Sequence, residues 1–185
     1  MRFNLSTAIL ACAAIASAGF TIPDDLPHGS YEVSFDDADN ANFTLIDDVS
    51  SIPTVPAGKR TKRAISFPSG TSTNYPNTIW FNANDFFGSN YNNFREACSH
   101  RGSSNVVGNG KSLVNYAGDS LAFMCSYAKS GSPCSVDEWG SAVDMLVNKG
   151  PSQSGGSLAP AWLNIPAWYK VRSSFGSHPH FLTVC

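Results

Sequence analysis

The stretch SLVNYAGDSLAFMCSY, residues 112–127, decides the fold. Two β-rich segments, Ser112–Ala117 and Ser120–Tyr127, flank the dipeptide Gly118-Asp119, which favours the tight turn of a two-residue hairpin. Side chains alternate along the second segment, with Leu121, Phe123, Cys125 and Tyr127 on one face and Ala122, Met124 and Ser126 on the other. The stretch therefore predicts an antiparallel hairpin with two distinct faces.

A helix is expected shortly after this hairpin. Ser135-Val136-Asp137-Glu138 has the spacing of a capping box, in which Ser135 and Glu138 satisfy each other's backbone N–H groups. The predicted buried stripe consists of Val136, Trp139, Val143, Leu146 and Val147. Lys149-Gly150-Pro151 then ends the helix. We interpret Asp137 and Glu138 as capping and dipole-compensating residues rather than as an acid–base pair.

A second helix is expected before the hairpin. The spacing of Phe87, Tyr91, Phe94 and Cys98 predicts one apolar helix face beginning near residue 85. Asn84 or Asp85 can cap the first turn of this helix, which ends before Arg101-Gly102. A β-rich segment, Thr78–Phe81, precedes it.

The C-terminal part of the chain predicts further strands. Ala161–Arg172 is interpreted as a long aromatic strand kinked at Pro166, Ser177–His180 as a turn, and His180–Cys185 as a last short strand. The resulting order, β-α-β-β-α-β-β, predicts an α+β fold, a two-layer sandwich of an antiparallel sheet with two helices on one face.

The N-terminus has the pattern of a secretion signal. Arg2 precedes the apolar run Leu5–Ala18, which closes with the small residues Ala16-Ser17-Ala18. Residues 1–18 are therefore predicted to be a signal peptide, and the protein is predicted to be secreted and extracellular.

An acidic segment follows. Residues 19–58 contain eight acidic side chains and no lysine or arginine, and we expect this segment to be disordered by itself. The paired basic residues of a kexin-type processing site come next, at Lys59, Arg60, Lys62 and Arg63. We therefore predict a pro-segment over 19–63 and a mature domain over 64–185. Asn42 begins a glycosylation sequon, which requires an exposed loop.

Composition excludes several classes of protein. The 185 residues carry a formal net charge of −2, which argues against a nucleic-acid-binding protein. No apolar run is long enough for a membrane-spanning helix. The predicted mature domain contains Cys98, Cys125, Cys134 and Cys185, an even number that predicts two disulfides in one of three connectivities. Their spacing does not fit a zinc site, and no metal or cofactor is expected.

The segments 118–123, 134–135, 145–150 and 182–185 together carry a resemblance to a known family. Over about residues 80–185, the chain resembles the secreted killer-toxin-like family of fungi, which includes virus-encoded killer toxins of smut fungi and the similar Ecp-type effectors. The resemblance implies two antiparallel helices packed on an antiparallel sheet. It also implies that Cys125 pairs with Cys185 and that Cys98 pairs with Cys134. Lys111 is the nearest match to a basic residue to which toxin action has been attributed.

Two functions remain open from the sequence. The first is a non-enzymatic, toxin-like effector that binds a surface protein, glycan or membrane component of a host plant cell or a competing microbe, through Lys111 and the aromatic residues Trp162 and Trp168. The second is a small secreted hydrolase of ribonuclease-like type, which needs two groups titrating near neutral pH and a cation. The candidates for such chemistry are Glu96, His100, His178, His180, Arg101 and Arg172.

Overall fold

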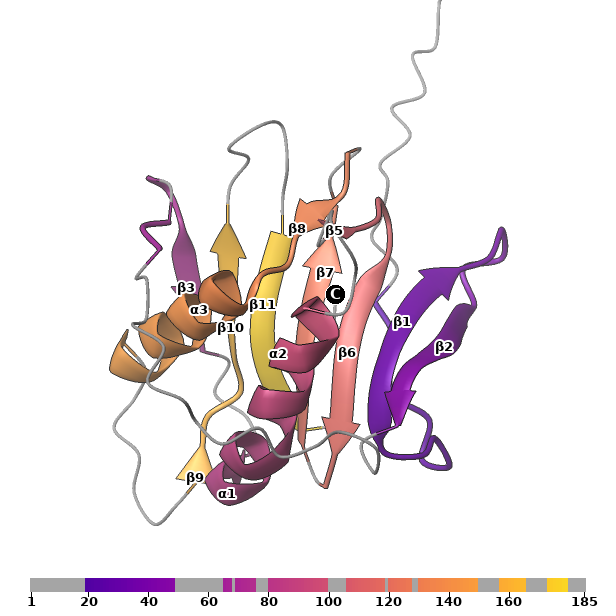
Figure 1. Ribbon diagram of the computed structural model, residues 1–185, viewed down its shortest axis with the longest axis horizontal. Coiled ribbons are helices and arrows are strands. Elements are labelled where there is room, and N and C mark those ends of the chain that lie inside the picture. The colour runs from indigo at the N-terminus through magenta and orange to yellow at the C-terminus, as the bar shows by residue number, and fades with distance from the viewer. Residues whose placement is uncertain are drawn as a thin grey trace, which may run out of the picture.

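The computed structural model describes residues 19–48, 65–67, 69–75, 80–99, 106–118, 120–127, 130–149, 157–165 and 173–179. This part of the chain is a mixed α+β structure built on one large antiparallel sheet (Figure 1). The strands of the large sheet are β1 (Gly29–Phe35), β2 (Ala41–Asp48), β3 (Ser72–Asn74), β6 (Ser112–Ala117), β7 (Ser120–Ser126), β10 (Ala161–Ile165) and β11 (Ser173–Pro179). The sheet has seven strands in the order β2-β1-β6-β7-β11-β10-β3.

The remaining elements are short ladders and helices. The ladders pair β4 (Phe81–Asn82) with β9 (Ser157–Leu158), and β5 (Val106–Val107) with β8 (Ser132–Pro133). The helical elements are α1 (Ala83–Asp85), the π-helical turn η2 (Phe86–Asn90), α2 (Tyr91–Ser99) and α3 (Val136–Lys149). Helices α2 and α3 lie over the same face of the sheet (Figure 1).

The predicted hairpin is confirmed as β6 and β7. Ala117 pairs with Ser120 across the turn, and Gly118 has the positive φ of 61° that such a turn requires. The predicted alternation is also confirmed, because the two faces of β7 belong to two different hydrophobic clusters. Ala122 and Met124 lie in the helix-side core, beneath the helices, whereas Leu121, Phe123 and Cys125 lie in a second cluster, the back-face core.

The capping box of α3 is confirmed in both directions. The Ser135 backbone N–H donates to Glu138 Oε2 at 2.9 Å, and the Glu138 backbone N–H donates to Ser135 Oγ at 3.2 Å. The predicted stripe is correct at its three central positions, whereas Val136 at its start is only half-buried and Val147 at its end is exposed. Trp139, Ala142, Val143 and Leu146 are the buried residues of α3. Val147 is 39% exposed, because it lies about 100° around the helix from Leu146 and turns away from the sheet.

The predicted face of the first helix is wrong at Phe87. In η2 the Tyr91 backbone N–H donates to Phe86 O, five residues back, so the chain gains an extra residue in this turn. A π-helical turn shifts the side-chain register, and the structure buries Phe86 while leaving Phe87 39% exposed. The cap also differs from the prediction, since it is Asn82 whose side chain accepts from the Asn84 backbone N–H at 2.8 Å.

Residues 19–58, which are expected to be disordered by themselves, are ordered over residues 19–48 within the folded chain. This segment, called the N-terminal segment below, contributes β1 and β2 to the edge of the sheet, and β1 pairs with β6 from Gly29–Tyr116 to Val33–Ser112. Its charges do not prevent folding, because its apolar residues alternate along β1 and pack on the rest of the chain. Residues 49–63 lie outside the described residues.

The C-terminal strands also differ from the prediction. The predicted turn at Ser177–His180 is wrong for Ser177–Pro179, which lie in β11 and pair with β7. Their turn-like composition is overridden because β11 is paired on both sides, with β7 and β10. The long aromatic strand is described only as β10, and the predicted last strand, His180–Cys185, falls outside the described ranges.

Candidate functional site

Lys111 follows a tight turn at the start of β6. Its backbone N–H donates to Gly108 O at 3.2 Å, and its carbonyl accepts from the Ser126 backbone N–H at 3.0 Å. Gly110 occupies the turn with a φ of 66°. The lysine alkyl chain runs beside Gly108, where an added Cβ would lie 3.3 Å from Lys111 Cδ. Backbone and side chain of Lys111 are therefore both positioned by the turn.

The ammonium group of Lys111 is paired with a residue of the N-terminal segment. Lys111 Nζ forms a hydrogen-bonded ion pair with Glu32 Oε1 on the neighbouring strand β1, and the two side chains are 44% and 24% exposed. Ion pairs with this exposure contribute only about 0–1 kcal/mol to stability. The pair therefore positions a surface cation more than it stabilises the fold.

The N-terminal segment also covers one face of the central hairpin. From this segment, the buried members of the back-face core are Phe20, Ile22, Tyr31 and Val33. They pack against the residues of β6 and β7 whose side chains point away from the helices, which are Val114, Tyr116, Leu121, Phe123 and Cys125. The helices cover the other face of the hairpin, so the side chains of β6 and β7 are buried on both faces of the sheet. Lys111 directly precedes β6, a strand that the N-terminal segment covers on this face.

A buried polar cluster lies beside the same strands, on the helix side of the sheet. Asn115 Nδ2 donates to Ser30 Oγ of the N-terminal segment at 2.9 Å. Asn90 of η2 donates through Nδ2 to the backbone carbonyls of Asn115 and Ser120, at 3.2 and 2.6 Å. The Oδ1 atoms of Asn90 and Asn115 are buried without a hydrogen-bond partner among the described residues. These hydrogen bonds connect η2, the hairpin and β1 in one buried polar cluster.

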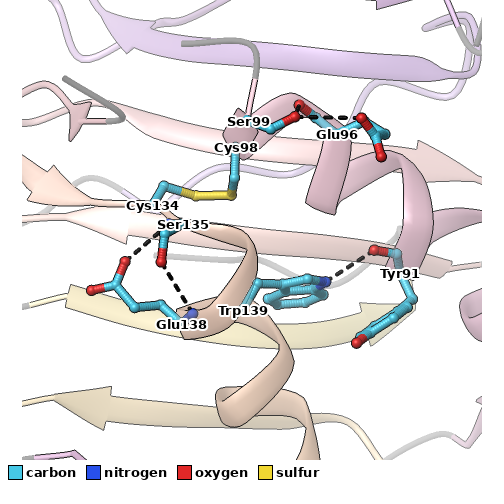
Figure 2. The surroundings of a disulfide bond; sticks show 8 residues. All are labelled: Tyr91, Glu96, Cys98, Ser99, Cys134, Ser135, Glu138 and Trp139. Atoms are coloured by element: carbon cyan, nitrogen blue, oxygen red, sulfur yellow. Dashed lines mark hydrogen bonds between the residues drawn. A yellow bond between two sulfur atoms is a disulfide. The ribbon is translucent and has the colours of Figure 1, made fainter. Parts of the chain in front are cut away.

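A disulfide links the two helical parts. Cys98, near the end of α2, is joined to Cys134, with the Cα atoms 5.1 Å apart, and the capping box of α3 begins at the next residue (Figure 2). Beneath the disulfide, Trp139 Nε1 donates to Tyr91 O at 3.0 Å (Figure 2). The Cys98–Cys134 pairing is the one that the resemblance implies. Cys125 is also disulfide-bonded, and its predicted partner, Cys185, falls outside the described ranges.

The other predicted binding and processing residues are only partly described. Trp162 lies in β10, where it is paired with Gly176 of β11 and Asn74 of β3. Trp168 and the basic residues Lys59, Arg60, Lys62 and Arg63 lie outside the described residues. Asn42 lies in β2 rather than in a loop, although its side chain is exposed as the sequon requires. In the described sheet, β7 and β11 lie between β6 and β10, so the backbone of Trp162 is not next to Lys111.

The residues proposed for hydrolysis form no described site. Glu96 lies on α2 and accepts from Ser99 Oγ through its backbone carbonyl at 2.8 Å. His178 is placed in β11, opposite Leu121, by its backbone alone. His100, Arg101, Arg172 and His180 fall in undescribed ranges. Within the described ranges, no three His, Cys, Asp or Glu side chains are grouped to hold a metal ion, and no helix is long and apolar enough to cross a membrane.

Two features of the site were missed by sequence reasoning. The first is Glu32, the partner of Lys111, which belongs to a segment whose composition predicts disorder. The alternation of Tyr31, Val33 and Phe35 with polar residues is the signal that could have identified β1. The second feature is the exposure of two aromatic side chains, Trp80 at 45% and Phe87 at 39%.

Comparison of the chain with known proteins found no matching family model, curated protein or solved structure.

Proposed function

We propose that this protein is a secreted, disulfide-bonded, toxin-like effector that acts on another cell, a host plant cell or a competing microbe, without catalysing a reaction. It is exported through residues 1–18 and matured by a kexin-type protease at the dibasic residues 59–63. In this proposal residues 64–185 form the two-layer sandwich of β-α-β-β-α-β-β order, with the antiparallel helix pair of the killer-toxin-like family.

The observation that carries this proposal is the placement of Lys111. The turn positions the backbone of Lys111, its alkyl chain runs beside Gly108, and its ammonium group pairs with Glu32. Even so, 44% of the side chain is accessible to a partner. A pre-positioned cation loses little conformational entropy on binding, which favours recognition of an acidic group. We therefore propose that Lys111 contacts a surface protein, glycan or membrane component of the target cell, with Trp162 and Trp168 as further binding residues.

The disulfide supports a protein that acts outside the producing cell. The Cys98–Cys134 bond joins α2 to the start of α3, and disulfides persist mainly in oxidising compartments. Loss of a native disulfide from a small secreted domain costs about 2–5 kcal/mol. The activity should therefore disappear when the protein is reduced.

The test applies the oxidised, processed protein to fungal and plant cells while growth and calcium uptake are followed. We expect a dose response that reduction abolishes. The variant Lys111→Gln should raise the half-maximal dose at least about tenfold, the effect of losing roughly 1.4 kcal/mol of binding. Lys149→Gln, at the exposed end of α3, is the matched control and should act like the wild type.

Two results would contradict the proposal. One is the absence of any effect on both cell types from a folded, oxidised protein. The other is RNA cleavage that the double variant His178→Ala/His180→Ala abolishes, which would favour the ribonuclease-like hydrolase instead.

A further inference from the structure

Many non-covalent contacts, in addition to the covalent chain, attach the N-terminal segment to the rest of the fold. The dibasic residues at 59–63 lie between β2, which ends at Asp48, and the next described residue, Ile65. Cleavage there would cut the backbone between the N-terminal segment and residues 65–185. It would leave untouched every contact that the two parts make with each other.

The first group of these contacts is polar. Strand β1 pairs with β6 along Gly29–Val33, and this pairing protects the backbone of a strand that would otherwise be at the edge of the sheet. On the helix side, Asn115 Nδ2 donates to the buried Ser30 Oγ at 2.9 Å. The ion pair of Lys111 with Glu32 adds charge complementarity at the end of the same pair of strands.

The second group is apolar and lies on the opposite face. Ile22 and Val33 are 2% and 0% exposed, so almost none of either side chain contacts water. The residues of β6 and β7 beneath them are equally buried. Loss of the N-terminal segment would expose Val114, Leu121 and Phe123 together as one apolar patch. Contiguous exposed patches of this kind are rare on folded proteins unless a partner covers them.

We propose that the N-terminal segment remains bound after processing, so that the mature protein is a non-covalent complex of two chains in which residues 19–48 supply strands β1 and β2. This inference rests on the proposed processing. Its partner surface is the edge of β6 together with the back face of β6 and β7. Maturation thus cuts the chain without removing the segment, and Lys111 keeps its contact with Glu32 in the active protein.

The test separates retention from processing. Residues 59–63 of the secreted chain are replaced by a thrombin site, and the purified protein is cut completely, as judged by denaturing gel electrophoresis. Size-exclusion chromatography and native mass spectrometry then measure whether the two pieces travel together. We expect a single species with one copy of each piece. Elution of the N-terminal piece by itself would overturn the proposal, whether the remainder stays folded or aggregates.

A pair of variants tests which contacts retain the segment. In the cut protein, exchange of the bound piece against a fluorescently labelled copy gives its dissociation constant. Ile22→Ala should raise this constant at least about tenfold, since burial of this side chain is nearly complete. Leu45→Ala, in the same piece but 51% exposed, should change it less than about twofold. Equal effects of the two variants would refute the proposed surface. Because no readout involves toxicity or a kexin-type protease, failure of the proposed function would leave these results unaffected.

Discussion

Replacing Val33 by alanine tests whether the N-terminal segment is part of the cooperative fold. Val33 is fully buried in the back-face core and is paired with Ser112 of β6. All four tryptophans, Trp80, Trp139, Trp162 and Trp168, lie in the sequence after residue 64, so their fluorescence reports on the other part of the chain. A change at Val33 therefore alters the unfolding of that part only if the two parts unfold together.

The magnitude follows from the buried volume that is lost. Removing two methyl groups withdraws about 1.6 kcal/mol of transfer free energy, and the remaining cavity brings the loss to about 2–3 kcal/mol. With a urea m-value of about 2 kcal/mol/M, the midpoint should fall by roughly 1–1.5 M. The control Leu45→Ala removes a side chain that is 51% exposed, and its midpoint should change by a few tenths of a molar unit at most.

The assay is urea unfolding of the intact oxidised chain, followed by tryptophan fluorescence and by far-ultraviolet circular dichroism. We expect coincident curves from both probes for the wild type and for Val33→Ala. A Val33→Ala midpoint that equals the wild-type value would refute the reasoning, because the N-terminal segment would then fold independently of the tryptophan-containing part.

The remaining predictions concern a turn, a pH dependence and a modification. In thermal unfolding, Gly131→Ala should destabilise the protein by more than about 2 kcal/mol, because the φ of Gly131 is 79° and an added Cβ would lie 2.7 Å from Val107 O. Gly110 has a φ of 66° but no atom within 4 Å of an added Cβ, so Gly110→Ala should cost only the backbone strain of about 1 kcal/mol in the same experiment. Hydrogen bonds from the Asn40 side chain and backbone and from the Ala38 N–H lower the pKa of Asp36 below 3.8, so this carboxylate stabilises the β1–β2 turn above pH 3.8 and loses its effect as the pH falls through the lowered value. The protection factors of residues 36–40, which compare each exchange rate with the intrinsic rate at the same pH, should therefore fall on acidification, and Asp36→Asn should weaken that pH dependence; an unchanged profile would contradict the assignment. Asn42 should carry a glycan in the secreted protein, seen as a mass loss on treatment with an amidase for N-glycans, and Asn42→Gln should show no such loss.

The elements that the sequence predicts correctly are those determined by neighbouring residues. Gly118 defines the β6–β7 turn, and the Ser135–Glu138 pair defines the start of α3, because each interaction spans only a few positions. The face of the first helix was predicted less well. A single π-helical hydrogen bond, from Tyr91 N–H to Phe86 O, rotates the side chains, and a simple helical period does not encode it.

The elements that the sequence does not predict depend on distant partners. Strand β1 is stabilised by β6, which lies about 80 residues away along the chain, and β11 is stabilised by β7 and β10 on its two sides. Composition alone favours disorder for the acidic segment and a turn for Ser177–Pro179. Of the candidate site, Lys111 was identified through the family resemblance, but its contact with Glu32 depends on the same distant pairing.

The claim that the N-terminal segment still completes the sheet after the chain is cut is tested most directly by hydrogen–deuterium exchange of β6. Peptides covering Ser112–Ala117 are compared in the intact chain and after complete cleavage at the thrombin site. Since one edge of β6 pairs with β1 and the other with β7, we predict that the protection of these amides is the same before and after cleavage. Loss of protection in about half of the β6 amides on cleavage, with those facing β7 still protected, would contradict the claim.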